Sequence, residues 1–280
     1  MKLTGNIRGL ASKKRVRVAV GVGEEDAASI QRLAEARQEV ERLGLARTIL
    51  VSKARLNGNN YCKAEEPEKE IIRLLKFGEV EAVVRGTLPA GPFIRLVRTA
   101  YDIDEIYRIG LLETFDGEDF FFAPVGIDEG ATISQKLRLI SEGSRLLRSL
   151  GASVKVGVLS GGRKEDLGRS ENVDKSLAEG ELITLIAGET GIPNVGHYAI
   201  LIEDAVRSGA DLIIAPDGIS GNLIYRALVH LGAGRSHGAV YCGLKDVIVD
   251  TSRAAPTGEY VGAIALAAAV AQVTKFTRSS

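Results

Sequence analysis

Residues 15–52 read RVRVAVGVGEEDAASIQRLAEARQEVERLGLARTILVS, and this stretch decides the fold class. The apolar runs at 16–22 and 48–52 predict two strands. Between them, residues 27–43 repeat apolar side chains at the spacing of one helical face, and Gly44 follows where a helix commonly ends. A strand, a helix and a second strand in this order indicate a βαβ unit with a parallel sheet.

The same alternation continues along the chain, with one interruption. Two apolar runs flank Asp116-Gly117, a dipeptide typical of a hairpin turn, and predict an antiparallel edge. Thr132 and Gln135 then have the spacing of a capping box, which predicts the start of a helix. The strand pattern resumes at 154–159. With 280 residues and about 150 per domain, we predict an α/β fold of two domains.

Composition limits the classes of function. Lys plus Arg and Asp plus Glu both number 36, the isoelectric point is near 6.9 and the mean hydropathy is +0.07. No net charge attracts nucleic acid or an anionic membrane, and we expect neither as a partner. The apolar stretch 261–273 is shorter than the roughly 20 residues that span a membrane. Two cysteines are too few for a disulfide framework, so we expect a cytoplasmic protein.

Polar loops that follow strands and precede helices are where open α/β sheets hold ligands. The first, residues 21–26 (GVGEED), imitates a dinucleotide-binding loop, but its three acidic residues would repel a phosphate and instead complement a helix dipole. The second supplies Ser160, Gly161, Gly162 and Arg163. These residues suit a phosphate as well as they suit a solvated loop.

The third loop lies between the strand pattern DLIIA and the helix pattern LIYRALVHL at 223–231. It supplies four polar or flexible residues: Asp217, Ser220, Gly221 and Asn222. Glycine allows a sharp turn and a close backbone approach, whereas Ser220 and Asn222 either cap the helix or bind an anion. Spacing alone leaves both interpretations open.

A fourth junction follows the strand pattern DVIVD at 246–250. Ser252 supplies a hydroxyl, Arg253 a fixed cation and Glu259 a carboxylate just inside an Ala-rich helix. Arg253 would hold phosphate oxygens, Ser252 would donate to a developing charge and Glu259 would accept a proton. Alternatively, Thr257 caps the helix and Glu259 is an ordinary first-turn acid. The three histidines lack metal-ligand spacing, so we expect no metal site.

Residues 211–271 resemble the phosphate acetyltransferase and butyryltransferase family, the phosphotransacylases. The matching positions are Pro216, Asp217, Gly221, Asn222, Gly243, Leu244, Asp250, Ser252 and Arg253. A weaker similarity runs upstream through Gly86-Thr87 and Arg95. The resemblance implies two α/β domains of the isocitrate and isopropylmalate dehydrogenase type with a cleft between them. Here these would be residues 1–130 with 245–280, and residues 131–244. It also implies a homodimer.

The resemblance further implies that an acyl group is exchanged between phosphate and coenzyme A, a substrate rather than a tightly bound cofactor. In the family, a carboxylate takes the thiol proton while a Ser-Arg pair stabilises charge and phosphate. Ser252 and Arg253 match this pair, and Glu259 occupies the position of the family's aspartate. Arg95 matches a second phosphate-binding arginine, and Thr87 lies in the same weakly similar segment.

Two segments depart from the family pattern. Its Ser-Tyr-Ser-Thr-x-Gly-Ser segment is replaced by SGGRKED at 160–166. Its Asp-Gly-Glu-Leu-Gln-Phe-Asp segment has no counterpart in GETGIPNVGHYAILIED at 188–204, so we expect substrate recognition to differ. The PDGISGN segment resembles most the archaeal branch called methanogenesis marker protein 4 or methyltransferase subunit X. Two alternatives therefore remain. One is a methyltransferase component of methanogen metabolism, and the other is a non-catalytic ligand-binding or assembly protein of the same fold.

Overall fold

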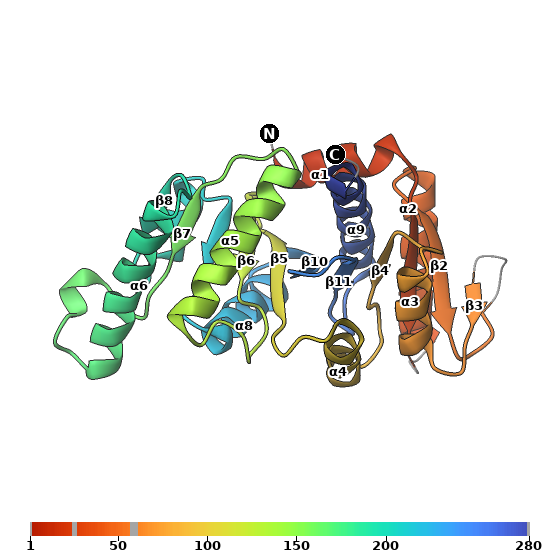
Figure 1. Ribbon diagram of the computed structural model, residues 1–280, viewed down its shortest axis with the longest axis horizontal. Coiled ribbons are helices and arrows are strands. Elements are labelled where there is room, and N and C mark those ends of the chain that lie inside the picture. Colours follow the sequence, from red (N-terminus) through yellow and green to blue (C-terminus); the bar gives the residue numbers. More distant parts are fainter. Residues whose placement is uncertain (1, 24–26, 57–60, 279–280) are drawn as a thin grey trace. The chain divides into compact units, whose positions relative to one another are not determined.

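The computed structural model describes residues 2–23, 27–56 and 61–278. The chain forms two compact units, residues 1–106 with 236–280, and residues 107–235. The sequence-based division fell later, after residues 130 and 244. The structure therefore assigns the hairpin near Asp116 to the second unit and the strand before Cys242 to the first. Each unit alternates helices and strands (Figure 1), as the α/β prediction requires.

The first unit contains a six-stranded mixed sheet in the order β3-β2-β1-β4-β11-β10. All neighbouring strands in it are parallel except β10 and β11. Val20 lies opposite Leu50 on one side and Val84 on the other, so the centre of the sheet is wholly apolar. The elements are α1 (Leu3–Lys13), β1 (Arg17–Val22), α2 (Ala27–Arg42), β2 (Arg47–Ser52), β3 (Tyr61–Lys63), α3 (Pro67–Lys76), β4 (Ala82–Val84), α4 (Ala90–Tyr101), β10 (Arg235–Cys242), β11 (Val247–Asp250) and α9 (Thr257–Arg278).

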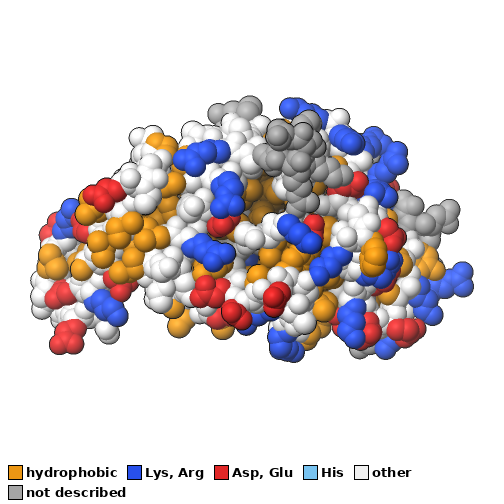
Figure 2. All heavy atoms as spheres, in the orientation of Figure 1, with side chains coloured by type: hydrophobic (Ala, Val, Ile, Leu, Met, Phe, Trp, Pro, Cys, Tyr) orange, Lys and Arg blue, Asp and Glu red, His pale blue; other side chains and the backbone are white. Residues whose placement is uncertain are grey.

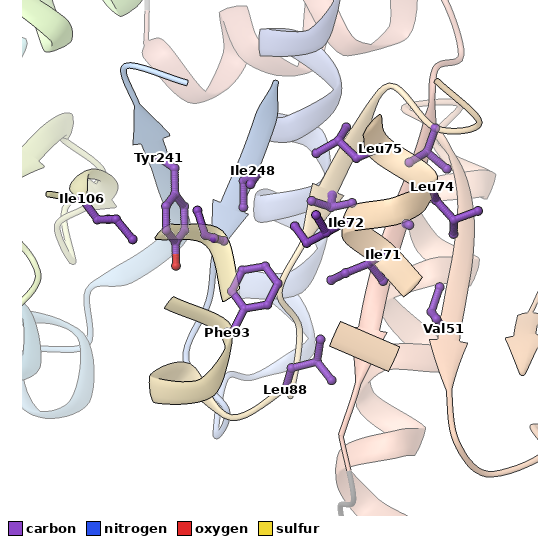
Figure 3. Packing of buried hydrophobic residues seen from close by; sticks show 14 residues of the cluster. Val51, Ile71, Ile72, Leu74, Leu75, Leu88, Phe93, Ile106, Tyr241 and Ile248 are labelled. Carbon is purple, nitrogen blue, oxygen red and sulfur yellow. The ribbon is translucent and has the colours of Figure 1, made fainter. Parts of the chain in front are cut away.

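Aliphatic side chains of α3 and the sheet form a large part of the core of this unit. Ile71, Ile72, Leu74 and Leu75 project from α3 toward side chains of the sheet and of the segment that leads into α4 (Figure 3). Phe93 of α4 meets the ring of Tyr241 edge to face, with the ring centroids 6.4 Å apart. Burial of these surfaces contributes roughly 25 cal/mol per Å² of apolar area and fixes the sheet beneath the strand ends.

The Ala-rich helix α9 is packed inside the first unit. Its small side chains let it lie close to α1, α2, β4 and β11. The amide nitrogen Nε2 of Gln272 donates to the carbonyl oxygens of Leu10 (2.8 Å), Ala11 (3.0 Å) and Lys14 (2.9 Å), which ties the end of α1 to α9. Within the described ranges, no helix has the length and apolar character that crossing a bilayer demands.

The second unit contains a five-stranded sheet in the order β5-β6-β9-β7-β8. The hairpin β5-β6 is antiparallel, and the remaining pairs are parallel. Its elements are β5 (Tyr107–Glu113), β6 (Asp119–Ala123), α5 (Ile133–Ser149), β7 (Val156–Val158), the 3-10 turn η1 (Lys164–Asp166), α6 (Glu171–Glu189), β8 (Val195–His197), α7 (Ile202–Arg207), β9 (Leu212–Ile214), α8 (Gly218–Arg226) and the π-helical turn η2 (Ala227–Leu231).

The hairpin turn and the capping box that the sequence predicts in this unit are both present. Gly117 has φ 87° in the hairpin turn, and Thr132 Oγ1 accepts from the Gln135 amide at 3.2 Å in a capping box. The helix predicted at 223–231 is corrected, because α8 begins at Gly218 and turns π-helical from Ala227. Figure 2 shows positive and negative side chains interspersed on one face, in keeping with their equal numbers.

Candidate functional site

The carboxyl ends of the parallel strands in the first unit meet at one edge of its sheet. Strands β1, β2, β4 and β11 run parallel, so the residues that follow them lie together. Gly86, just after β4, has φ 63°, and a Cβ there would collide with the carbonyl oxygen of Gly21. Thr251 Oγ1 donates to the carbonyl oxygen of Gly86 at 2.9 Å. This close backbone approach fixes the ends of three strands against one another.

A buried ion pair lies beneath this edge. The guanidinium of Arg85 donates to Asp250 Oδ1, to the carbonyl oxygen of Leu88 and to the carbonyl oxygen of Thr251. The Arg85 side chain is 4% exposed and the Asp250 side chain 11%. Because three fixed acceptors surround one guanidinium, Arg85 holds the end of β11 and the segment after β4 in place.

Glu259 is buried at the start of α9, and its carboxyl group has a raised pKa. Its residue exposure is 3%, and its Oε1 accepts from the backbone N–H of Ser252 at 2.9 Å. Burial raises the pKa of Glu259 to about 7, opposed by the Ser252 N–H, by the Ser236 hydroxyl and by the charge of Arg85. The carboxylate of Asp250 raises that pKa further. Glu259 therefore changes charge near neutral pH.

Tyr260 positions the backbone of the predicted Ser252-Arg253 pair. Its buried hydroxyl lies 3.2 Å from the carbonyl oxygen of Ser252 and 3.1 Å from that of Arg253, and donates to this pair of acceptors. The Ser252 side chain is half-buried, and its hydroxyl makes no hydrogen bond within the described part of the chain. Arg253 is exposed. The structure thus brings Ser252, Arg253 and Glu259 to one junction.

A pocket of about 410 Å³ opens at the same sheet edge. Its walls come from the segments that follow five strands (β1, β2, β3, β4 and β11) and from the starts of α3 and α4, and include Gly23, Lys53, Glu65, Glu68, Pro89 and Arg253. Two cations and two carboxylates therefore face one cavity. Arg253 lines the pocket directly, whereas Ser252, its neighbour in the chain, and Glu259 are not among the lining residues.

Thr87 and Arg95 have different positions around this pocket. Thr87 is fully buried, and its Oγ1 accepts from the Gly23 N–H at 2.9 Å. This contact ties the segment after β4 to the end of β1. Arg95 is exposed on α4, and its guanidinium turns back toward Gly91 in the first turn, where a Cβ would lie 3.5 Å from Nη1. Pro89, which begins that turn, lines the pocket.

In the second unit, the predicted loop before α8 is occupied by contacts within the chain. Asp217 Oδ1 accepts from the Ser220 amide at 2.8 Å, which caps the helix. A Cβ at Gly221 would collide with the carbonyl oxygen of Pro124. Asn222 Nδ2 donates to the carbonyl oxygen of Val125 at 2.9 Å. Capping and close approach therefore account for these four residues without a ligand.

The loop at 160–163 is also tied to its surroundings. The Gly161 amide donates to Ser176 Oγ at 2.8 Å, and the Arg163 amide donates to Asp166 Oδ2 at 2.8 Å. A side chain at Gly162 would press on Val173 of α6. The buried Ser160 hydroxyl lies 2.9 Å from Nε2 of His197, a residue for which the sequence suggested no role.

Several residues that form the first-unit junction were missed in the sequence. Two of them could have been found from their neighbours in the sequence. Arg85 is a charged residue at the end of a predicted strand, and Tyr260 is an aromatic residue next to the predicted site residue Glu259. Lys53, Glu65 and Glu68 carried no such signal, because exposed charges are common on α/β surfaces. The described residues contain no group of three or more His, Cys, Asp or Glu side chains that would hold a metal ion. The acidic part of the GVGEED loop, residues 24–26, lies outside the described residues.

The fold defined by these units is that of the phosphotransacylases. A branched-chain phosphotransacylase from Enterococcus faecalis superposes with a TM-score of 0.73 over 92% of this chain and 99% of its own, at 16% identity. A phosphate acetyltransferase from Rickettsia typhi is 27% identical over 240 residues, covering 76% of this chain and 65% of the relative.

A protein of Methanosarcina mazei described as a putative methyltransferase mtx subunit X is much more similar. It is 44% identical over 274 residues, which cover 96% of this chain and 95% of the relative. No family model matches the chain. The chain belongs to the family of these mtx subunit X proteins, and the predicted resemblance to that branch of the phosphotransacylases is confirmed.

Proposed function

We propose that this chain is a transferase of the phosphotransacylase type, which moves an acyl group between phosphate and the thiol of coenzyme A. The observation that carries the proposal is the buried carboxyl of Glu259, with a pKa of about 7, joined to the Ser252-Arg253 backbone. The fold and the family support it. Coenzyme A acts as a substrate, with no tightly bound cofactor.

Glu259 would serve as the base that removes the thiol proton. An ordinary glutamate has a pKa near 4.3 and a thiol a pKa near 8.5, so proton transfer from the thiol is unfavourable by about four pKa units. With the pKa of Glu259 at about 7, the gap falls to about 1.5 units, or about 2 kcal/mol. The thiolate then attacks the carbonyl carbon of the acyl phosphate, the bond from that carbon to the phosphate oxygen breaks, and the departing phosphate takes the proton from Glu259, which restores the carboxylate.

Arg253 would hold the phosphate in the pocket that it lines. Its planar guanidinium forms two parallel hydrogen bonds to phosphate oxygens, and the Ser252 hydroxyl donates to the charge that develops on the carbonyl oxygen. The guanidinium of Arg95 turns back toward Gly91, in the turn that follows the pocket residue Pro89, and would add a second positive charge. Lys53 in the same wall would serve longer anionic substrates.

The proposal extends to the substrate, the cellular location and the oligomeric state. The substrate is a small phosphorylated or acyl-bearing molecule, the protein acts in the cytoplasm and it forms a homodimer. Because Asp217, Ser220, Gly221 and Asn222 serve local structure, their contribution to binding would be indirect.

The test is the release of free thiol from acyl coenzyme A esters of different chain length in the presence of phosphate. We expect turnover by the native chain and a loss of about 10²-fold or more in kcat/KM for Arg253→Ala and Glu259→Gln. Arg47→Ala is the matched control, because Arg47 is an exposed arginine at the opposite end of β2. Full activity of Arg253→Ala would contradict the proposal.

Methyl transfer is the second candidate function. It is favoured by the 44% identical relative from Methanosarcina mazei, whose description is a putative methyltransferase subunit. Saturable binding of S-adenosylmethionine, or copurification with a corrinoid protein, together with no thiol release, would favour this alternative. Binding of acyl coenzyme A or phosphate without turnover would instead indicate a non-catalytic protein of the same fold.

A further inference from the structure

Three side chains of the second unit form a chain of polar contacts that the proposed transferase chemistry does not use. Ser160 Oγ lies 2.9 Å from Nε2 of His197, and Nδ1 of His197 lies 3.1 Å from Oε1 of Glu181. The His197 side chain is 4% exposed. Its Nδ1 forms no hydrogen bond within the described part of the chain, so its contact with Glu181 is an ion-pair contact. A hydroxyl, an imidazole and a carboxylate in this order are the parts of an activated serine.

The local fold explains how three distant residues meet. Ser160 follows the parallel strand β7, and His197 ends the neighbouring strand β8, where it lies opposite Val158. Glu181 comes from α6, which packs against both strands. Gly180 leaves room for the imidazole, because a Cβ there would occupy the space of Nε2. The ring is therefore held by backbone register and by a glycine on the facing helix.

The carboxylate selects the tautomer of His197. An ionised glutamate only accepts hydrogen bonds, so the proton of the neutral ring belongs on Nδ1. Contacts with His197 and with Lys164, whose Nζ lies 3.2 Å from the same Oε1, hold the pKa of Glu181 below its usual range and keep it ionised. The lone pair on Nε2 then faces the Ser160 hydroxyl at 2.9 Å. The same hydroxyl has a second, longer acceptor in the carbonyl oxygen of Gly162 at 3.4 Å, and its proton passes to the nearer Nε2 during attack.

We propose that Ser160 is a nucleophile that accepts a small acyl group from an activated ester or thioester, with His197 as its base and Glu181 as a positioning residue. Oγ attacks the carbonyl carbon, and its proton passes to Nε2 of His197. The bond to the leaving alcohol or thiol breaks, and the leaving group takes that proton. Water then attacks the Ser160 ester by the same route, which releases the acid and restores the hydroxyl.

Burial limits which acyl donors reach this serine. Ser160 is 1% exposed, and the adjoining Gly161 is exposed and carries no side chain. Access to Oγ therefore requires the backbone of Gly161 and Gly162 to shift, and the space gained admits an acetyl group more readily than a long acyl chain. This nucleophile is separate from Arg253 and Glu259, which belong to the first unit.

The full-length chain is treated with p-nitrophenyl acetate and, separately, with a small alkyl fluorophosphonate. Adducts are then located by peptide mass spectrometry. We expect a single modified serine, Ser160, with a burst of p-nitrophenol equal to the amount of protein. Ser160→Ala should abolish the adduct, and His197→Gln should slow its formation by about 10²-fold or more. Ser149→Ala, a serine whose hydroxyl only contacts the Leu146 carbonyl, is the control and should label normally.

Further variants separate activation from simple packing. Glu181→Gln should slow acylation at an unchanged melting temperature, and Glu181→Asp should restore part of the rate, which a packing role would not produce. Arg253→Ala should leave labelling intact, so that failure of the proposed transferase does not affect this result. Absence of a Ser160 adduct in the native chain, or equal labelling rates in native chain and His197→Gln, would overturn the proposal.

Discussion

The backbone N–H of Ser252 donates to the carboxylate of Glu259 across 2.9 Å, and this contact joins the loop after β11 to the first turn of α9. The N–H stabilises the charged form of Glu259, whereas burial favours the neutral form and outweighs it. A carboxyl held in this balance titrates near neutral pH. The consequences concern both the stability of the fold and the rate of the proposed reaction.

Glu259→Gln should change how stability depends on pH. The pKa of Glu259 is raised from 4.5 to about 7 on folding, so the folded chain holds its proton more tightly than the unfolded chain. This contribution to stability is complete below pH 4.5 and is lost as pH rises through 7, with a total of about 3 kcal/mol. Urea unfolding should show similar stability of both proteins at pH 5 and a more stable variant at pH 9. A parallel pH dependence of the two proteins would contradict the assignment.

The rate of thiol-dependent acyl exchange should follow the ionisation of the same carboxyl. Only ionised Glu259 accepts the thiol proton, so kcat/KM should rise about tenfold per pH unit below pH 7 and level off above it. The measurement is a pH profile, between pH 5 and 9, of thioester formation from one acyl phosphate and coenzyme A. In Glu259→Gln the residual rate should lose the inflection near pH 7, and an unchanged inflection would assign it to another group.

Arg85→Met should destabilise the first unit by about 3–5 kcal/mol, because it leaves the Asp250 carboxylate buried without its partner. Chemical denaturation followed by circular dichroism measures the loss. Arg47→Ala, which removes an exposed arginine from the same sheet, should change stability by less than about 0.5 kcal/mol. An equal decrease in the free energy of unfolding of the two variants would show that the Arg85 contacts contribute little to stability.

Gly221→Ala and Gly9→Ala should have opposite effects. A methyl group at Gly221 would collide with the carbonyl oxygen of Pro124, so we expect a loss of about 1–3 kcal/mol. Gly9 is exposed within α1, with nothing within 4 Å of its Cβ position. Alanine there should add about 0.5–1 kcal/mol through helix propensity. Melting temperatures of the two variants test both statements, and tolerance of Gly221→Ala would refute the close approach.

Much of the fold follows from short-range patterns. The strands near 16–22 and 48–52, the hairpin at Asp116-Gly117 and the capping box at Thr132 depend on neighbouring residues, and the structure contains all of them. The start of α8 was predicted too late, because Ser220 and Asn222 were considered as helix caps, whereas the structure has Asp217 in that role. The candidate site was predictable only in part. The Ser252-Arg253 pair and Glu259 were identifiable, whereas the pocket and the partners of His197 were not.

By itself, the sequence determined which residues alternate between strand and helix, and which polar residues follow the ends of strands. Both are local consequences of side-chain periodicity and backbone preference. Only the tertiary structure decided that Arg85 and Asp250 meet beneath the junction, that Glu259 loses its water, and that Ser160, His197 and Glu181 form one chain of contacts. Burial and the approach of distant side chains depend on how whole strands and helices pack, which spacing along the chain does not encode.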